Sequence, residues 1–270
     1  MKNFHEAITN LPMKDMDSVL LVTALQAHLA DVPLSEQERA DIARAIVFAS
    51  YLHREDKRHT PTRDSSGKVH ADVDPYIVHP LRNTVRMVRW GISNADAIIA
   101  SLLHDVVEDH AFDIYAEFVN EAPAEDVSED VVRAASLNYI REQFNENVAV
   151  LVEYMSNPII ENFRNVPVVE RNAIYALHVS ESLSANAYVY WIKFADFVDN
   201  ALSAHHGKID RYASRRSRKY LPLVAMFQKH LEENSNGVRD LVNESSVADV
   251  RKRLSRADDY LLGIINEHPM

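Results

Sequence analysis

The sequence predicts an all-α protein, and three observations lead to this prediction. Only five of the 270 residues are Gly, so few positions favour a break in a helix. Long stretches of Ala, Leu, Val, Arg and Glu fill the chain, a composition typical of helical proteins. No segment shows the alternating apolar and polar pattern of a half-buried strand.

The ends of two helices can be assigned from their capping residues. Ser35 and Glu38 have the spacing of a capping box, which predicts a helix that runs to about His53. Pro80 suits the first turn of a helix that continues to Trp90. Further helices are expected at residues 94–108, 128–155, 187–204, 214–233 and 246–267.

We expect three parts along the chain. Residues 1–34 form an N-terminal extension, residues 35–233 the central domain, and residues 234–270 a linker followed by a C-terminal helix. The linker is predicted from the polar run Glu232–Gly237. The two ends either pack on the central domain or mediate self-association, so a homo-oligomer stays an open alternative.

The segment Leu102–Asp109 places four ionisable side chains in an apolar helix, in the order Leu-Leu-His-Asp-Val-Val-Glu-Asp. An imidazole and three carboxylates cannot be buried unpaired without a large cost in free energy. A divalent metal ion held by His104 and Asp105 would meet that requirement. On one continuous helix, Glu108 would share a face with His104. The alternative is a core histidine beside a surface acid.

Two other residues are candidate ligands for the same ion. His79 precedes Pro80 at the start of a predicted helix, and Asp196 ends the aromatic and aliphatic run that begins at Tyr188. A single His before Pro is more often a capping or turn residue. The chain has no Cys, which leaves imidazole and carboxylate as ligands and favours Mn²⁺, with Fe²⁺ or Zn²⁺ as alternatives.

The set His79, His104, Asp105 and Asp196 resembles the metal-binding signature of the HD-domain phosphohydrolases. Residues 75–81 and 102–109 resemble the hydrolase domain of RelA/SpoT proteins and of the small alarmone hydrolases, and the similarity runs from about residue 43 to about residue 231. The resemblance implies an HD-domain helical bundle at residues 35–233. It also implies a metal-dependent hydrolase that removes the 3′-pyrophosphate of (p)ppGpp and yields GDP or GTP.

The acidic pair Glu108 and Asp109 is the candidate catalytic pair. A bound divalent ion can lower the pKa of water toward about 7. Neither carboxylate is needed as a ligand, so either could orient or deprotonate the attacking water. The alternative is a solvated helix end without a role.

Basic and aromatic residues are candidates for binding the nucleotide. The resemblance implies substrate contacts from Arg54, Lys57, Arg58, Asn200, Arg216 and Tyr220. Arg can hold a phosphate with two hydrogen bonds, and Tyr offers a stacking face and a hydroxyl. The alternative for the two residues of the 214–233 helix is a solvated basic face.

Three departures from the family pattern concern the substrate. The stretch from His53 to Pro75 is longer than in the family, His110 stands in place of Thr, and Phe197 replaces Arg or Lys. We expect His110 to lie in a loop or at the surface, and His53 to shape the pocket or lie at the surface. A phosphohydrolase for another nucleotide and a non-catalytic alarmone-binding module therefore stay open. Fewer than 40 residues follow Glu233, so no synthetase domain is expected.

Charge and hydropathy narrow the expected partners. The formal net charge of -11 disfavours nucleic-acid binding, which needs a basic face. No run of about 18 apolar residues and no signal-peptide core is present, so we expect neither membrane spanning nor export. A cytoplasmic enzyme with a small-molecule nucleotide substrate is the expectation.

Overall fold

All regular elements in the described part of the chain are helical. The computed structural model describes residues 11–58, 74–119, 127–159, 163, 165–203 and 210–269. In these ranges the extended backbone pairs only at an isolated antiparallel bridge between Lys57 and Pro75. None of their helices combines the length and the apolar character that a membrane crossing requires. The all-α prediction is confirmed.

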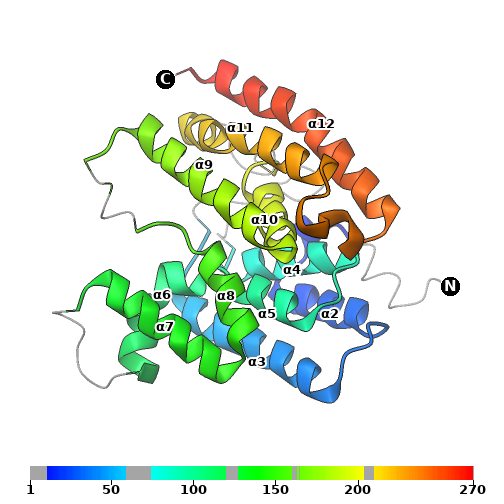
Figure 1. Cartoon of the computed structure of the whole chain (residues 1–270), viewed down its shortest axis with the longest axis vertical. Helices are drawn as coiled ribbons and strands as arrows, with labels where there is room; N and C mark the ends of the chain where they lie inside the picture. The colour runs from blue at the N-terminus through cyan, green and yellow to red at the C-terminus, as the bar shows by residue number, and fades with distance from the viewer. Residues whose placement is uncertain are drawn as a thin grey trace.

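Three largely buried helices form the middle of the molecule. These are α4 (Val78–Arg89), α5 (Ala95–Leu103) and α10 (Ala187–Asn200), and Figure 1 shows the other helices around them. The surrounding helices are α2 (Ser18–Leu29), α3 (Glu36–Leu52), α6 (Val106–Ile114), α7 (Glu129–Gln143), α8 (Glu146–Met155), α9 (Val168–Ala185), α11 (Arg211–Glu232) and α12 (Glu244–Glu267). Because α4, α5 and α10 are enclosed on most sides, polar residues on them must find partners inside the protein.

The two capping predictions agree with the structure. Ser35 Oγ accepts a hydrogen bond from Glu38 N at 3.2 Å, and Glu38 Oε2 accepts one from Ser35 N at 2.7 Å, which completes the capping box of α3. Pro80 lies in the first turn of α4, where its missing N–H breaks no helical hydrogen bond.

Two long predicted helices are each interrupted. The helix expected at 94–108 ends at Leu103 and resumes as α6 at Val106, because His104 Nδ1 bonds to Ser101 O at 2.8 Å, an acceptor that the next turn would use. The helix expected at 128–155 breaks at Phe144. There Asn145 starts α8 by accepting a hydrogen bond from Val148 N at 2.9 Å. His104 and Asp105 keep right-handed helical dihedrals at the first of these interruptions, so the stacking of Glu108 on His104 stays a prediction.

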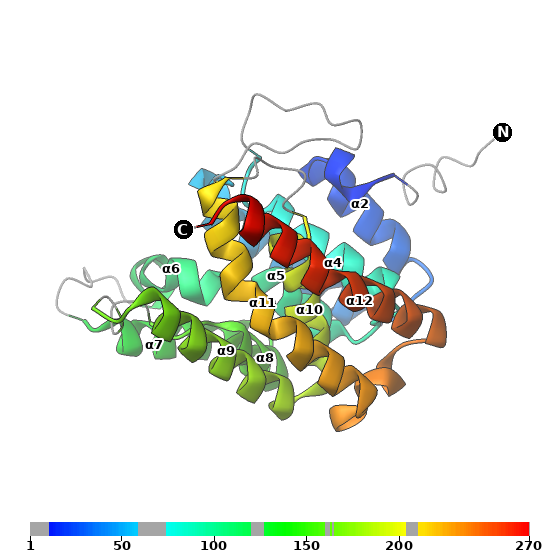
Figure 2. The same cartoon turned by 90° about the horizontal axis from the view of Figure 1, so that it is seen from above.

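The terminal segments pack on the central helices. Helix α2 contacts α4, and α12 lies along α11, as Figure 2 shows from above. Buried residues of α2 and α12 belong to the same hydrophobic core as α4 and α10. The run predicted as a linker leads into a 3-10 helix at Ser235–Leu241, and the carbonyl of its buried Val238 accepts a hydrogen bond from Trp191 Nε1 at 3.0 Å. Helices α2 and α9 were not expected.

Candidate active site

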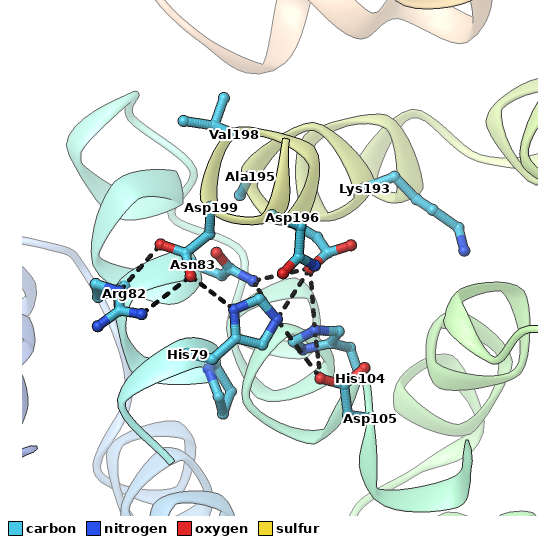
Figure 3. A network of polar contacts seen from close by, with 12 residues as sticks. His79, Arg82, Asn83, His104, Asp105, Lys193, Ala195, Asp196, Val198 and Asp199 are labelled. Atoms are coloured by element: carbon cyan, nitrogen blue, oxygen red, sulfur yellow. Dashed lines mark hydrogen bonds and ion pairs between the residues drawn. The ribbon is translucent and has the colours of Figure 1, made fainter. Parts of the chain in front are cut away.

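Four candidate metal ligands converge from three parts of the chain. His79 lies in the first turn of α4, His104 and Asp105 join α5 to α6, and Asp196 lies in the last turn of α10 (Figure 3). The donor atoms of the first three all lie within 4.8 Å of one another. Asp196 Oδ1 lies 2.9 Å from His79 Nε2 and 3.7 Å from His104 Nε2. The structure thus brings together all four residues that the sequence suggested.

The hydrogen bonds of the two imidazoles orient one ring nitrogen of each toward the centre. His104 Nδ1 donates to Ser101 O at 2.8 Å, and its buried Nε2 has no hydrogen-bond partner among the described residues. His79 Nδ1 lies 2.8 Å from Asp199 Oδ2. Each Nε2 therefore points at carboxylate oxygens. Asp196 Oδ1 lies 2.9 Å from His79 Nε2, and Asp105 Oδ2 lies 3.1 Å from His104 Nε2. Two imidazole nitrogens and two carboxylates that face one point fit a divalent cation.

The pKa values in this cluster show that positive charge is favoured at its centre. Burial alone would lower the pKa of His104, but Asp105 and Asp196 raise it well above its usual range. Burial alone would raise the pKa of Asp105, but His104 and His79 hold it well below its usual range, and both imidazoles act on Asp196 in the same way. Both carboxylates are therefore ionised at neutral pH, and positive charge is favoured between them.

Asp199 is a residue of the site that the sequence reasoning missed. Its side chain is fully buried and its Oδ1 accepts from Arg82 Nε at 3.0 Å, while its Oδ2 faces His79. Burial alone would raise its pKa, but Arg82 and Lys14 lower it well below the usual range. The carboxylate fixes the His79 ring, as carboxylates behind metal-bound histidines do. Its spacing of three from Asp196 on a buried helix was the available signal.

A cavity of about 550 Å³ opens beside the cluster. It includes six residues predicted from the sequence, namely Arg58, Glu108, Asp109, Asn200, Arg216 and Tyr220. Among the described residues, its cationic lining side chains are Arg58, Arg171, Arg215, Arg216 and Lys219. We call these five residues the cationic wall. These cations come mainly from α9 and α11 and offer local positive charge in a chain of net charge -11.

The acidic pair lies between the metal cluster and the cavity. Glu108 Oε2 accepts hydrogen bonds from Asn157 N at 3.0 Å and Asn157 Nδ2 at 2.8 Å, so Asn157 holds this carboxylate in place. Asp109 is exposed to the cavity, where partial desolvation by the surrounding protein and the charges of Asp105 and Glu108 raise its pKa to about 7. Such a carboxylate can exchange a proton near neutral pH. Asn157, Arg171 and Tyr175 also line the cavity and were not predicted as site residues.

Three of the predicted substrate residues are linked to the metal cluster or to an aromatic wall. Asn200 Nδ2 donates to Asp196 Oδ1 at 2.6 Å, and Arg58 Nη2 donates to Asn200 Oδ1 at 3.2 Å. The buried ring of Tyr220 packs edge-on against Phe197, with ring centroids 6.0 Å apart. Phe197 is thus part of the aromatic core, which explains an apolar residue where the family has a cation.

Two predicted residues lie away from the cavity lining. Arg54 donates to Tyr51 O at 2.8 Å, lies over the Tyr51 ring at 4.2 Å and faces Glu117 at 3.6 Å. Lys57 is exposed, and its backbone pairs with Pro75. Most of the long stretch between His53 and Pro75, residues 59–73, lies outside the described residues, so its predicted role near the nucleotide stays a prediction.

The predicted surface placement of His110 is wrong. His110 and His53 are both buried, and they meet at Asp56. The contact joins the end of α3 to α6, which only the tertiary structure brings together. His59, His70, His205 and His206 lie outside the described residues.

Comparison with known proteins supports the resemblance to a family of hydrolases. No protein-family model matches the chain. The guanosine-3′,5′-bis(diphosphate) 3′-pyrophosphohydrolase of Aquifex aeolicus is 32% identical over 134 residues, which cover 48% of this chain and 17% of that protein. A probable guanosine-3′,5′-bis(diphosphate) 3′-pyrophosphohydrolase of Mycoplasma pneumoniae is 34% identical over 68 residues, or 25% of this chain and 8% of that protein. The chain thus spans a small part of the length of either relative, and the similarity is to hydrolases.

Proposed function

We propose that this chain is a metal-dependent hydrolase that removes the 3′-pyrophosphate of (p)ppGpp. The observation that carries the proposal is the convergence of His79, His104, Asp105 and Asp196 beside a cavity with a cationic wall. The names of the two similar enzymes support this substrate. Water would attack the phosphorus that is bonded to the 3′ oxygen, the bond between that phosphorus and the 3′ oxygen would break, and the 3′ oxygen would take up a proton. The products would be pyrophosphate and GDP or GTP.

The metal cluster and the acidic pair have separate tasks in this proposal. His79, His104, Asp105 and Asp196 would hold Mn²⁺, with Fe²⁺ or Zn²⁺ as alternatives. When bound, the ion supplies Lewis acidity and makes nearby water more acidic. Asp109 would accept the proton of the attacking water on a carboxylate oxygen, because its pKa of about 7 suits a base at neutral pH. Glu108, held by Asn157, would orient that water.

The cationic wall would hold the phosphates of the substrate. Arg216 and Lys219 lie on α11, and Arg58, which donates to Asn200, lines the same cavity. Hydrogen bonds from guanidinium groups to phosphate oxygens are among the stronger contacts in proteins. Tyr220 and Tyr175 add aromatic surface to the same cavity. We infer that these residues select a small anionic nucleotide.

The test is release of pyrophosphate from ppGpp by the purified full chain, with Mn²⁺ and after chelation. We expect metal-dependent release that His104→Ala and Glu108→Ala abolish. His230→Gln is the matched control, because His230 lies on α11 outside both the cluster and the cavity lining. Release from other nucleotides but not from ppGpp would replace the substrate assignment, and tight ppGpp binding without product would indicate a sensor.

A further inference from the structure

A second cluster of metal-ligating side chains lies outside the site described above. His53 caps the end of α3 and begins the 3-10 turn His53–Glu55, Asp56 directly follows that turn, and His110 lies in α6. Asp56 Oδ2 lies 2.8 Å from His53 Nδ1 and 2.7 Å from His110 Nε2. The two ring nitrogens are 3.0 Å apart. We propose that His53, Asp56 and His110 form a second divalent transition-metal site.

The protonation of the two rings favours an ion over a hydrogen-bonded triad. His110 Nδ1 lies 2.8 Å from Asp113 Oδ2, so that nitrogen donates to Asp113 and Nε2 is the ring atom that faces Asp56. Without an ion, protons on both facing nitrogens would direct two N–H groups at the same Asp56 oxygen, with the two nitrogens only 3.0 Å apart. A cation among the three donors would remove this crowding. Asp113 then has the place that carboxylates take behind metal-bound histidines.

The spacing of the donors agrees with a shared ion. Metal bonds of about 2.1 Å at right angles place neighbouring donors about 3 Å apart. The three separations here are 2.7, 2.8 and 3.0 Å, which match three donors on one face of an octahedral ion. Two imidazoles and one carboxylate select Fe²⁺, Zn²⁺ or Mn²⁺ over Mg²⁺ and Ca²⁺, which prefer oxygen ligands.

The backbone and the burial also suit a small bound ion. Helix α6 departs from helical geometry at His110, with φ -128° and ψ 22°, and this is the residue whose ring reaches back to Asp56. The His53 side chain is fully buried and that of His110 is 9% exposed, whereas the Asp56 side chain is 37% exposed. The site is therefore enclosed by the protein on the imidazole side and open to solvent beside Asp56.

One tyrosine separates the proposed second site from the first cluster. The Tyr76 ring stacks on His53 with centroids 4.7 Å apart, and its hydroxyl donates to Asp105 Oδ2 at 2.8 Å. Tyr76 also lines the cavity. An ion at the second site would join the end of α3 to α6 behind the Tyr76 ring and hold that ring in place. The inference does not rest on the proposed reaction.

The test counts Zn²⁺ ions on the purified full chain after chelation and reloading, by elemental analysis and by calorimetric titration. We expect about two ions per chain for the wild type and about one for Asp56→Ala. Asp130→Ala, a change at an exposed carboxylate of α7, is the matched control and should keep both. Asp113→Asn should weaken one of the two binding steps by about 10- to 100-fold, because it removes the negative charge of the carboxylate behind His110.

A variant of the first cluster makes the result independent of that site. The double change His104→Gln and Asp196→Asn should leave about one ion, which the further change Asp56→Ala removes. Should that variant fail to fold, Co²⁺-loaded wild type and Asp56→Ala are compared by visible absorption, where loss of one of two bands is expected. An unchanged ion count or an unchanged spectrum in Asp56→Ala would overturn the proposal.

Discussion

The metal cluster and the cationic wall of the cavity differ in how firmly their charged groups are held. In the metal cluster, His79, His104 and Asp196 each have a second partner, namely Asp199, Ser101 and Asn200. In the cationic wall, Arg215 is exposed and Arg216 is half-buried, with a ring contact to Tyr212 at 5.8 Å. Groups fixed by several buried bonds are suited to chemistry that tolerates little displacement. The looser cationic wall is suited to recognising charge.

The largest effect on activity should come from disrupting the metal cluster at Asp196. We expect Asp196→Asn to lower kcat by about 1,000-fold, because a ligand is lost and several kcal/mol of charge stabilisation go with it. Nucleotide affinity should change much less, since the cations of the cationic wall stay in place. Steady-state kinetics with Mn²⁺ and equilibrium binding of ppGpp would separate the two effects. Equal losses in kcat and in nucleotide affinity would contradict the division of chemistry and recognition between the metal cluster and the cationic wall.

Next in size is the effect of Asp199→Asn on stability. The change leaves Arg82, Arg86 and Lys14 buried beside a neutral amide, and such unpaired buried charges cost about 3 kcal/mol. Urea unfolding of the metal-free protein would measure it. Glu232→Gln is the control, because its pair with Arg251 is largely exposed and should contribute less than about 1 kcal/mol. Similar losses in the free energy of unfolding for both variants would show that Asp199 does not stabilise the buried cations.

A smaller effect should distinguish the two arginines that follow α3. Arg58→Ala removes a cation that lines the cavity and bonds to Asn200, so we expect KM to rise roughly 10-fold. Arg54→Ala removes a partly exposed pair with Glu117 and should change KM by less than about twofold. Steady-state kinetics of both variants with ppGpp would test this order. A larger effect of Arg54→Ala would place Arg54 on the substrate, as the sequence suggested.

The smallest expected effect is a pH dependence of stability due to Asp109. Its pKa is about 7 in the folded protein, above the unfolded value of about 3.9. The folded state therefore binds more protons between these values, and the free energy of unfolding falls as pH rises through that window. Because the side chain faces the solvent of the cavity, we expect a fall of about 1 kcal/mol. Urea unfolding of the metal-free protein at about pH 4 and pH 6 should show a smaller fall in Asp109→Asn.

The sequence identified the chemistry of the cluster better than the path of the chain through it. His, Asp and Glu in an apolar run need partners wherever they are buried, so their types alone indicated the candidate ligands. The break at His104 depends on a ring that bonds to a carbonyl of the preceding turn, and no residue type in that run signals it. The break at Phe144 had a signal in Asn145, a common capping residue.

The cationic wall and the second cluster depend on contacts between distant segments. Arg171 and Tyr175 reach the cavity because α9 packs on α11, a contact that no local pattern predicts. His110 looked like a surface residue because Asp56, its partner across 54 positions, lies in a different part of the sequence. Hydrophobic periodicity assigns a face to the core, but it does not say which other helix that face meets.

Lys14 connects the amino-terminal segment to the metal cluster. Its ammonium lies 3.5 Å from Asp199 Oδ1, with the Lys14 side chain 12% exposed, and Asp199 in turn orients His79. A shortened protein that starts at Ser35 would lose this counter-charge together with the cover that α2 provides over α4. Proteolytic loss of the residues before Ser35 would then lower the affinity for the ion, although these residues lie far upstream of His79 in the sequence. Preparations should be checked for an intact amino-terminal segment before their metal content is compared.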